Sequence, residues 1–154
     1  MNVKHIYYFV LAAIAAVGTW IAQAMGGWDI QTKLLAWMMG VDFITGWLCA
    51  AVFHKSLKTE TGGYDSRVGL KGLIRKGCIV LIVMVAAHLD QLTNTHAMRT
   101  ATILFFCAND GMSILENLGI MGIEYPPAMK AMFEVLRKKG DVKKEEKPPD
   151  GESE

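Results

Sequence analysis

The feature that most constrains the fold is the separation of apolar and charged residues along the chain. Residues 6–25 and 78–87 contain no charged side chain, whereas charged residues gather in 54–76 and 130–154. A run of about 20 apolar residues is long enough to cross the hydrocarbon core of a bilayer as a helix. The apolar fraction of 52% over 154 residues would also suit a hydrophobic globular domain. The distribution of apolar and charged residues along the chain therefore decides between a globular domain and a membrane protein. It predicts an all-α, polytopic integral membrane protein.

Four segments are predicted to span the membrane, although three spans are possible because the third segment is short when only its uncharged core is counted. They are residues 6–25, 32–53, 73–89 and 100–123. Residues 128–139, which follow two prolines, are predicted to form a short amphipathic helix that lies on lipid or packs under the bundle. We therefore expect a transmembrane domain over residues 1–139 and a disordered, charged cytoplasmic tail over residues 140–154.

The topology of these spans is predicted from the basic connection at residues 54–76. Basic residues are enriched in cytoplasmic loops, and four spans then place both termini in the cytoplasm as well. Four glycines suggest that much of this connection is turn rather than helix: Gly62, Gly63, Gly69 and Gly72. A cleaved signal peptide is the competing interpretation of residues 6–25, but their apolar run is longer than the usual 7–15 residues. Retention of the first span is favoured.

A polar stripe follows the fourth predicted span. On an α-helix its members fall within roughly one third of the circumference: Thr102, Asn109, Asp110, Ser113, Glu116 and Asn117. In the second span, Asp42 is followed at helical spacing by Thr45, Gly46 and Cys49. A charged side chain at the bilayer centre costs about 2.5–3.5 kcal/mol on insertion scales unless it faces protein or water. These carboxyl groups are therefore functional candidates, with purely structural hydrogen bonding as the alternative.

Motifs for catalysis are not found in the sequence. It contains no Gly-rich phosphate loop, no nucleophile elbow and no histidine pair at ligand spacing. We predict a non-enzymatic protein with no catalytic, cofactor-binding or metal site. Cys49, Cys78 and Cys107 are well separated in apolar runs and are expected to be packing residues. The net charge of +1 gives no reason to expect nucleic acid as a partner.

Helices with one polar stripe can avoid lipid in two ways. They can bury the stripe against neighbouring helices, or they can assemble in a ring around water. We favour the second arrangement, in which the chain is a subunit of a homo-oligomeric pore. One alternative is a small ion-coupled membrane transporter or its accessory subunit, in which Asp42 and Glu116 bind a proton or cation. Another is a structural anchor whose residues 128–154 recruit a soluble partner.

Four motifs follow one another along the chain: Asp42-Phe43-Ile44-Thr45-Gly46 followed by Ala50; residues 66–76; His88-Leu89-Asp90; and residues 108–117, Ala-Asn-Asp-Gly-Met-Ser-Ile-Leu-Glu-Asn, with Pro126 beyond. In kind and order they resemble those of the phage-lysis and toxin-secretion holins, the group with a basic loop and a Ser-Ile-Leu-Glu-Asn motif. The resemblance covers residues 34–136. Asp110 departs from the family pattern, which leads us to expect Glu there. The charge is kept, but the carboxyl group lies one methylene closer to the backbone.

The resemblance implies a protein that accumulates in the cytoplasmic membrane of a bacterial host, self-associates and opens timed holes for a phage endolysin or a toxin. The predicted partners are thus the lipid bilayer, further copies of the chain and an endolysin, with no cofactor. The pore and oligomerisation candidates are Asp42, Thr45, Gly46, Asn109, Asp110, Ser113, Glu116 and Asn117. The topology and counter-ion candidates are Lys71, Arg75, Lys76, Asp90 and Arg99.

Overall fold

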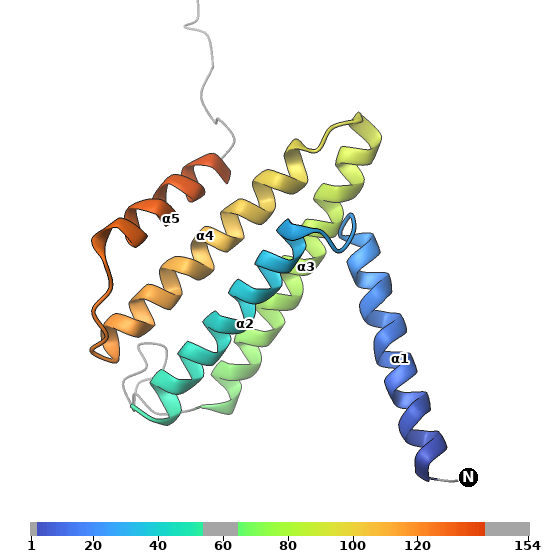
Figure 1. Cartoon of the computed structure of the whole chain (residues 1–154), viewed down its shortest axis with the longest axis horizontal. Helices are drawn as coiled ribbons and strands as arrows, with labels where there is room; N and C mark the ends of the chain where they lie inside the picture. Colours follow the sequence, from blue (N-terminus) through green and yellow to red (C-terminus); the bar gives the residue numbers. More distant parts are fainter. Residues whose placement is uncertain (1–2, 54–64, 141–154) are drawn as a thin grey trace, which may run out of the picture.

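The computed structural model describes residues 3–53 and 65–140, and its regular structure in these ranges is entirely helical (Figure 1). The elements are α1 Val3–Ala24, α2 Ile30–Ala51, α3 Ser66–Thr93, α4 Ala97–Ile120 and α5 Pro127–Gly140. The all-α prediction is confirmed. Of the described helices, α1, α2 and α3 are long and apolar enough to cross a membrane. The fourth predicted span, α4, has 24 residues but is not in this group, because its polar side chains lower its hydropathy.

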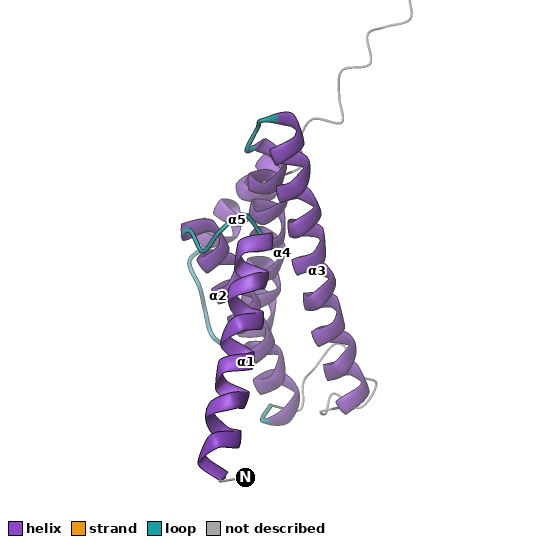
Figure 2. Ribbon diagram, turned by 90° about the vertical axis from the view of Figure 1, so that its right-hand side faces the viewer, coloured by secondary structure: helices purple, strands orange, loops and turns teal. Residues whose placement is uncertain are grey.

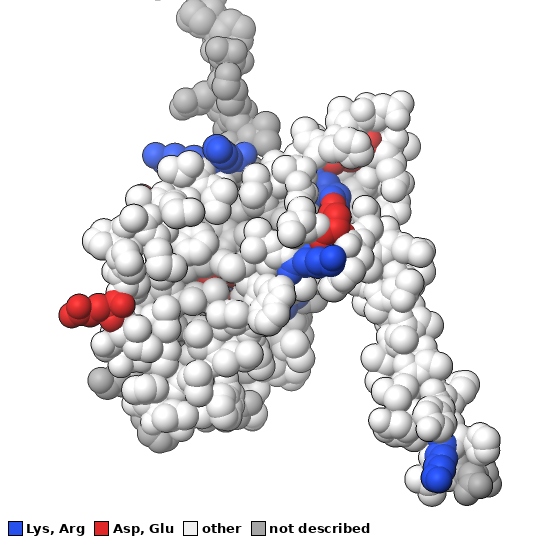
Figure 3. All heavy atoms as spheres, in the orientation of Figure 1, with Lys and Arg blue, Asp and Glu red and all other residues white. Residues whose placement is uncertain are grey.

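Helices α2, α3 and α4 form a bundle in which α4 contacts both of the others (Figures 1 and 2). The core between them contains Leu35, Val83, Ile103 and Cys107, all almost fully buried. Helix α1 has no buried residue, makes a small contact with α3 and projects away from the bundle (Figure 1). On the face seen in Figure 3, charged side chains gather in a few clusters on a largely uncharged surface.

Helix α5 folds back along α4 instead of lying beneath the bundle (Figure 1). Of the two predicted locations, on lipid or packed under the bundle, packing against the bundle is observed. Helix α5 lies along the side of α4 rather than beneath it. Residues 141–154, which make up nearly all of the predicted tail, lie outside the described residues.

The beginning of α3 differs from the prediction. Asp65 caps the helix, since its side chain accepts a hydrogen bond from the Arg67 amide at 2.8 Å, and α3 then starts at Ser66. The expectation of turn structure is therefore wrong for residues 66–76, whereas residues 54–64 lie outside the described residues. A glycine inside a helix costs only about 1 kcal/mol relative to alanine, so Gly69 and Gly72 are tolerated once the cap is present.

Candidate functional site

An ion triad joins the three helices of the bundle. Lys76 of α3 places its Nζ 2.7 Å from Asp42 Oδ2 of α2 and 2.7 Å from Asp110 Oδ2 of α4. The side chains of Lys76 and Asp42 are each 12% exposed, and that of Asp110 is 4% exposed. One ammonium group thus lies between two carboxylates, so the triad carries a net charge of −1 when all three are ionised.

The triad is held by charge more than by directed hydrogen bonds. Lys76 Nζ and Asp110 Oδ2 make no well-aligned hydrogen bond within the described part of the chain, and Asp42 Oδ1 has no donor there. The one-methylene shortening at Asp110 does not prevent it from reaching a cation. Removing one member of a buried ion pair leaves the remaining charge uncompensated, which typically costs about 3–5 kcal/mol.

A polar cavity of about 510 Å³ lies beside the triad. Besides the triad it is lined by Lys71 and Arg75 of α3, Arg137 of α5, and Asn109, Ser113 and Glu116 of α4, together with a few apolar residues. A cavity of this size with so many polar groups is suited to hold water rather than lipid. The helices therefore enclose a polar space on one side of the bundle.

The predicted stripe of α4 is divided between two surroundings. Asn109, Asp110, Ser113 and Glu116 line the cavity, as the pattern predicts for a shared face. Asn117 instead turns to α2, where its Nδ2 donates to Thr45 Oγ1 at 3.1 Å in a buried contact. Because α4 packs against α2, α3 and α5, a stripe one third of the circumference wide meets more than one of them.

The contact of Asn117 with α2 uses the small residues predicted there. A Cβ added at Gly46 would lie 3.7 Å from Asn117 Nδ2, an ordinary van der Waals distance, so Gly46 borders the amide without being required to make room for it. Cys49 Sγ donates a weak hydrogen bond to the Asn117 carbonyl at 3.9 Å. Thr45, Gly46 and Asn117 therefore serve a close α2–α4 contact in this conformation, separate from the cavity.

A second charged cluster lies at the end of the bundle where α2 and α4 begin. Arg99 Nη1 is 2.8 Å from Asp29 Oδ2, and its Nη2 donates to Asp29 Oδ1 at 2.9 Å and to Thr32 Oγ1 at 2.6 Å. Its Nε donates to the Met25 carbonyl. The Arg99 guanidinium holds the pKa of Asp29 well below its ordinary value, through the hydrogen bonds first and its charge last. In this structure Arg99 is thus a counter-ion of Asp29 and of none of the acidic residues of the stripe.

Asp29 was missed as a site residue by the sequence analysis. It is also the N-cap of α2, because its Oδ1 accepts from the Thr32 amide at 2.9 Å. An Asp that directly precedes an apolar helical run is a signal for an N-cap and could have identified it.

Asp90 caps a helix other than its own and forms no salt bridge with a basic side chain in the described part of the chain. Its carboxylate accepts from Thr95 Oγ1 at 2.7 Å, from the Met98 amide at 3.0 Å and from the Arg99 amide at 2.8 Å. His96, the residue before α4, provides no side-chain cap. The last two amides belong to the first turn of α4, so Asp90 satisfies donors that would otherwise have no partner.

The remaining candidates have simpler surroundings. Lys71 and Arg75 line the cavity and make no ion pair with any described residue. Cys49 and Cys107 are buried, as expected of packing residues, whereas Cys78 is exposed. Among the described residues, no three His, Cys, Asp or Glu side chains are grouped as a metal site would require.

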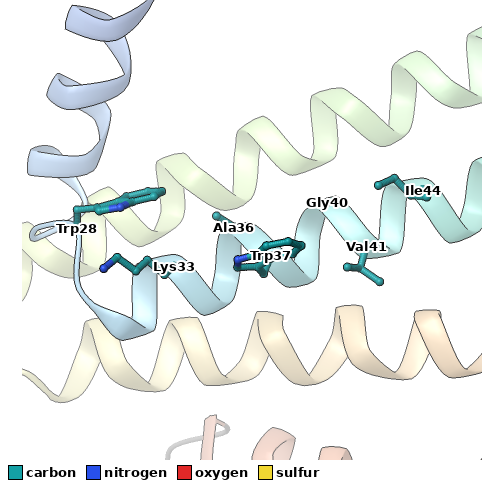
Figure 4. A pocket seen from close by; sticks show the side chains of 7 residues that line it. All are labelled: Trp28, Lys33, Ala36, Trp37, Gly40, Val41 and Ile44. Carbon is teal, nitrogen blue, oxygen red and sulfur yellow. The ribbon is translucent and has the colours of Figure 1, made fainter.

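A hollow of about 410 Å³ on α2 differs from the polar cavity (Figure 4). It is lined by two tryptophans, two aliphatic residues, two small residues and one lysine: Trp28, Trp37, Val41, Ile44, Ala36, Gly40 and Lys33. This surface offers no pair of groups for acid–base or metal chemistry. Exposed tryptophans next to a lysine suit an interface with lipid headgroups.

The fold and the site define a class, a helical membrane protein with ionisable residues among its apolar helices. Within that class the chain belongs to the Bacteriophage holin family, whose model matches residues 19–138. The resemblance drawn from the motifs is thereby confirmed. The family indicates a non-enzymatic protein.

Individual relatives agree with the family match. A "probable holin" of Bacillus phage phi105 is 33% identical over 106 residues, which cover 68% of this chain and 73% of that protein. An uncharacterized 14.9 kDa protein of Clostridium perfringens is 30% identical and covers 88% of this chain and 98% of its own length. An uncharacterized protein of Halalkalibacterium halodurans is 32% identical, with 86% and 94% covered. No solved structure matches the chain.

Proposed function

We propose that the protein is a holin that oligomerises in the bacterial cytoplasmic membrane and forms timed holes through which an endolysin or a toxin crosses. The observation that carries this proposal is the ion triad of Asp42, Lys76 and Asp110 beside a polar cavity. The similarity to a phage protein named a probable holin supports it. In our proposal α1 to α4 all cross the membrane, and the basic residues 54–76 and both termini lie in the cytoplasm, in agreement with the positive-inside rule.

The depth of the triad explains why its charges must be compensated. Asp42 lies 12 residues after the start of α2, and Asp110 lies 13 residues after the start of α4. At 1.5 Å per residue these positions are about 18–20 Å from the outer helix ends, inside a hydrocarbon core of about 30 Å. In the closed protomer, Lys76 pairs with both carboxylates and offsets one of their two charges, which lowers the cost of holding them in a single copy within lipid.

Assembly would change the surroundings of these groups. When copies surround a water-filled lumen, water can solvate the triad and the cavity lining, which removes the need for compensation within one protomer. A net charge of −1 also couples the equilibrium to the membrane potential, since moving one charge across 100 mV is worth about 2.3 kcal/mol. Loss of the potential would then change the balance between the closed and assembled forms.

The test is reconstitution of the purified protein in liposomes that contain a folded fluorescent protein and a small fluorescent ion. A holin at high density releases both cargoes together and abruptly. Selective, saturable flux of the ion, with the folded protein retained, would contradict the proposal.

That contradicting result would support the second candidate, an ion-coupled transporter or accessory subunit. One observation favours it: Asp42 Oδ1 is buried next to the cavity and has no donor among the described residues. A proton or cation bound at Asp42 would satisfy this oxygen within a closed bundle. Asp42→Asn would then abolish the saturable flux.

A further inference from the structure

The docking of α5 brings its charged end to the middle of α4. Gly111 lies 14 residues after the start of α4, and a Cβ added there would overlap the ring of Phe133 of α5. The glycine therefore provides the space into which the aromatic ring packs. Since α5 runs back along α4, the residues after Phe133 continue away from the cytoplasmic end of α4 (Figure 1).

The last turn of α5 carries three cations, Arg137, Lys138 and Lys139, and all three side chains are exposed. They lie four to six residues after Phe133, which is about 6–9 Å further along the helix axis. If α4 crosses the bilayer, as we propose, these cations are near its centre. Lysine and arginine are among the residues that are least favourable in that place when they face hydrocarbon.

The outer face of α3 has an apolar surface, in contrast to the charged end of α5. On α3, Leu81 and Val85 are each 60% exposed, and Ile82 is 49% exposed, with no charge among them. Arg137, in contrast, joins α5 to the lining of the polar cavity, which also contains Lys71, Arg75 and Glu116. The bundle thus has one charged side, formed by α5 and the cavity, and one side suited to lipid.

We propose that in the assembled hole α5 remains docked on α4 and faces the water-filled lumen, while the outer face of α3 meets lipid. This inference rests on the proposed hole-forming function and adds the orientation of each protomer within the ring. It removes the conflict between the docked position of α5 and the bilayer, because the three cations are then solvated by water.

The first experiment measures the reaction of single cysteines with a charged, membrane-impermeant thiol reagent in liposomes that are leaking a trapped protein. In full-length protein without Cys49, Cys78 and Cys107, we would compare Met132→Cys and Val135→Cys of α5 with Leu81→Cys and Val85→Cys of α3. The two sets are matched, since the native side chains are 65% and 52% exposed on α5 and each 60% exposed on α3. We expect modification of the α5 cysteines and protection of the α3 cysteines. Equal protection of both sets in leaking liposomes would overturn the proposal.

A second experiment separates docked α5 from α5 that has moved to the membrane surface, where it would also react. Gly111→Cys and Phe133→Cys, combined with Met132→Cys, allow α5 to be tethered to α4 by oxidation at the site of their closest packing. Tethered protein that still leaks and is modified at position 132 supports the proposal. Tethered protein that no longer leaks, or that leaks with position 132 protected, overturns it. If the wild-type protein releases no cargo, the proposed function itself is contradicted.

Discussion

The two charged clusters of the bundle differ in how completely their polar groups are used. At one end, Arg99 donates to Asp29, to Thr32 and to a backbone carbonyl, and Asp90 accepts three hydrogen bonds. In the triad, Asp42 Oδ1 has no donor among the described residues, and a polar cavity lies alongside. A saturated network has little to gain from rearrangement, whereas water could improve the triad. From this difference we infer that the Arg99 cluster is a fixed clamp and that the triad is the part that opens if the protein forms a hole.

The largest expected effect comes from removing the central cation of the triad. Lys76→Met leaves two buried carboxylates without compensation, so we expect the free energy of unfolding in detergent to fall by about 3–5 kcal/mol. Lys71→Met is the matched control, because Lys71 lines the same cavity but makes no ion pair with any described residue. Equal stability of the two variants would show that the triad is not an energetic unit. The triple variant with Asp42→Asn and Asp110→Asn should recover most of the loss.

The second prediction concerns the timing of lysis in cells that express an endolysin. Asp110→Asn should change the lysis time more than Glu116→Gln, because Asp110 is ion-paired and 4% exposed, whereas Glu116 is exposed. Culture turbidity and dye entry provide the measurement, with membrane protein levels matched by immunoblotting. Unchanged timing for both variants would remove these carboxylates from the mechanism.

Substitution in the Arg99 cluster should reduce stability without changing the timing of lysis, in contrast to substitution in the triad. Arg99→Gln loses the two-point contact with Asp29, and hydrogen bonds to charged groups contribute about 1.5–3 kcal/mol each. Asp29 is 43% exposed, so we expect a total loss near the lower limit, about 1.5 kcal/mol. Lysis timing at matched protein levels should stay as in the wild type. A change in timing without a change in stability would contradict the assignment of this cluster as a fixed clamp.

A smaller effect is expected in the difference in stability between Gly26→Ala, next to the clamp, and Gly27→Ala. Gly26 has φ +93°, and a Cβ there would lie 2.8 Å from Arg99 Nε. Gly27→Ala is the control, since Gly27 has φ +109° but no atom within 4 Å of an added Cβ. Both variants carry backbone strain of about 1–3 kcal/mol. The free energy of unfolding, measured with denaturant, should fall further for Gly26→Ala than for Gly27→Ala, because only the first Cβ overlaps Arg99. Equal losses would argue against a rigid position of Arg99.

The smallest effect is a pH dependence of the clamp. Because Arg99 lowers the pKa of Asp29 below its ordinary value of 3.8, the ionised carboxylate stabilises the fold above that pH. The stabilisation is lost as the pH falls through the lowered pKa. The stability difference between wild type and Asp29→Asn should therefore be constant from neutral pH down to about pH 5 and should shrink below about pH 4. A difference that does not depend on pH would mean that Asp29 acts only as a neutral cap.

The sequence predicted the helical class and most helix positions because charge-free runs and proline pairs are local signals. It also identified Asp42, Asp110 and Glu116 as unusual carboxyl groups in apolar surroundings, and Lys76 as a candidate counter-ion. It did not predict that Lys76 lies between the carboxylates of Asp42 and Asp110, because that contact depends on how three helices are rotated against one another. The early start of α3 was missed because the stabilisation of the helix by the Asp65 cap outweighs the cost of two glycines. The role of Asp29 was missed because a residue in a turn can also bind a side chain 70 positions away.

The most direct test of the account concerns the surroundings of Ser113, which lies on the cavity wall one turn from Asp110. Ser113→Cys, in protein without native cysteines, is treated with a charged, impermeant thiol reagent in liposomes before and during release of a trapped protein. We predict that the reaction becomes at least about tenfold faster when the hole forms, since a charged, impermeant reagent can reach the thiolate only through bulk water. An unchanged rate in liposomes that release the protein would show that the polar face of α4 does not line the hole.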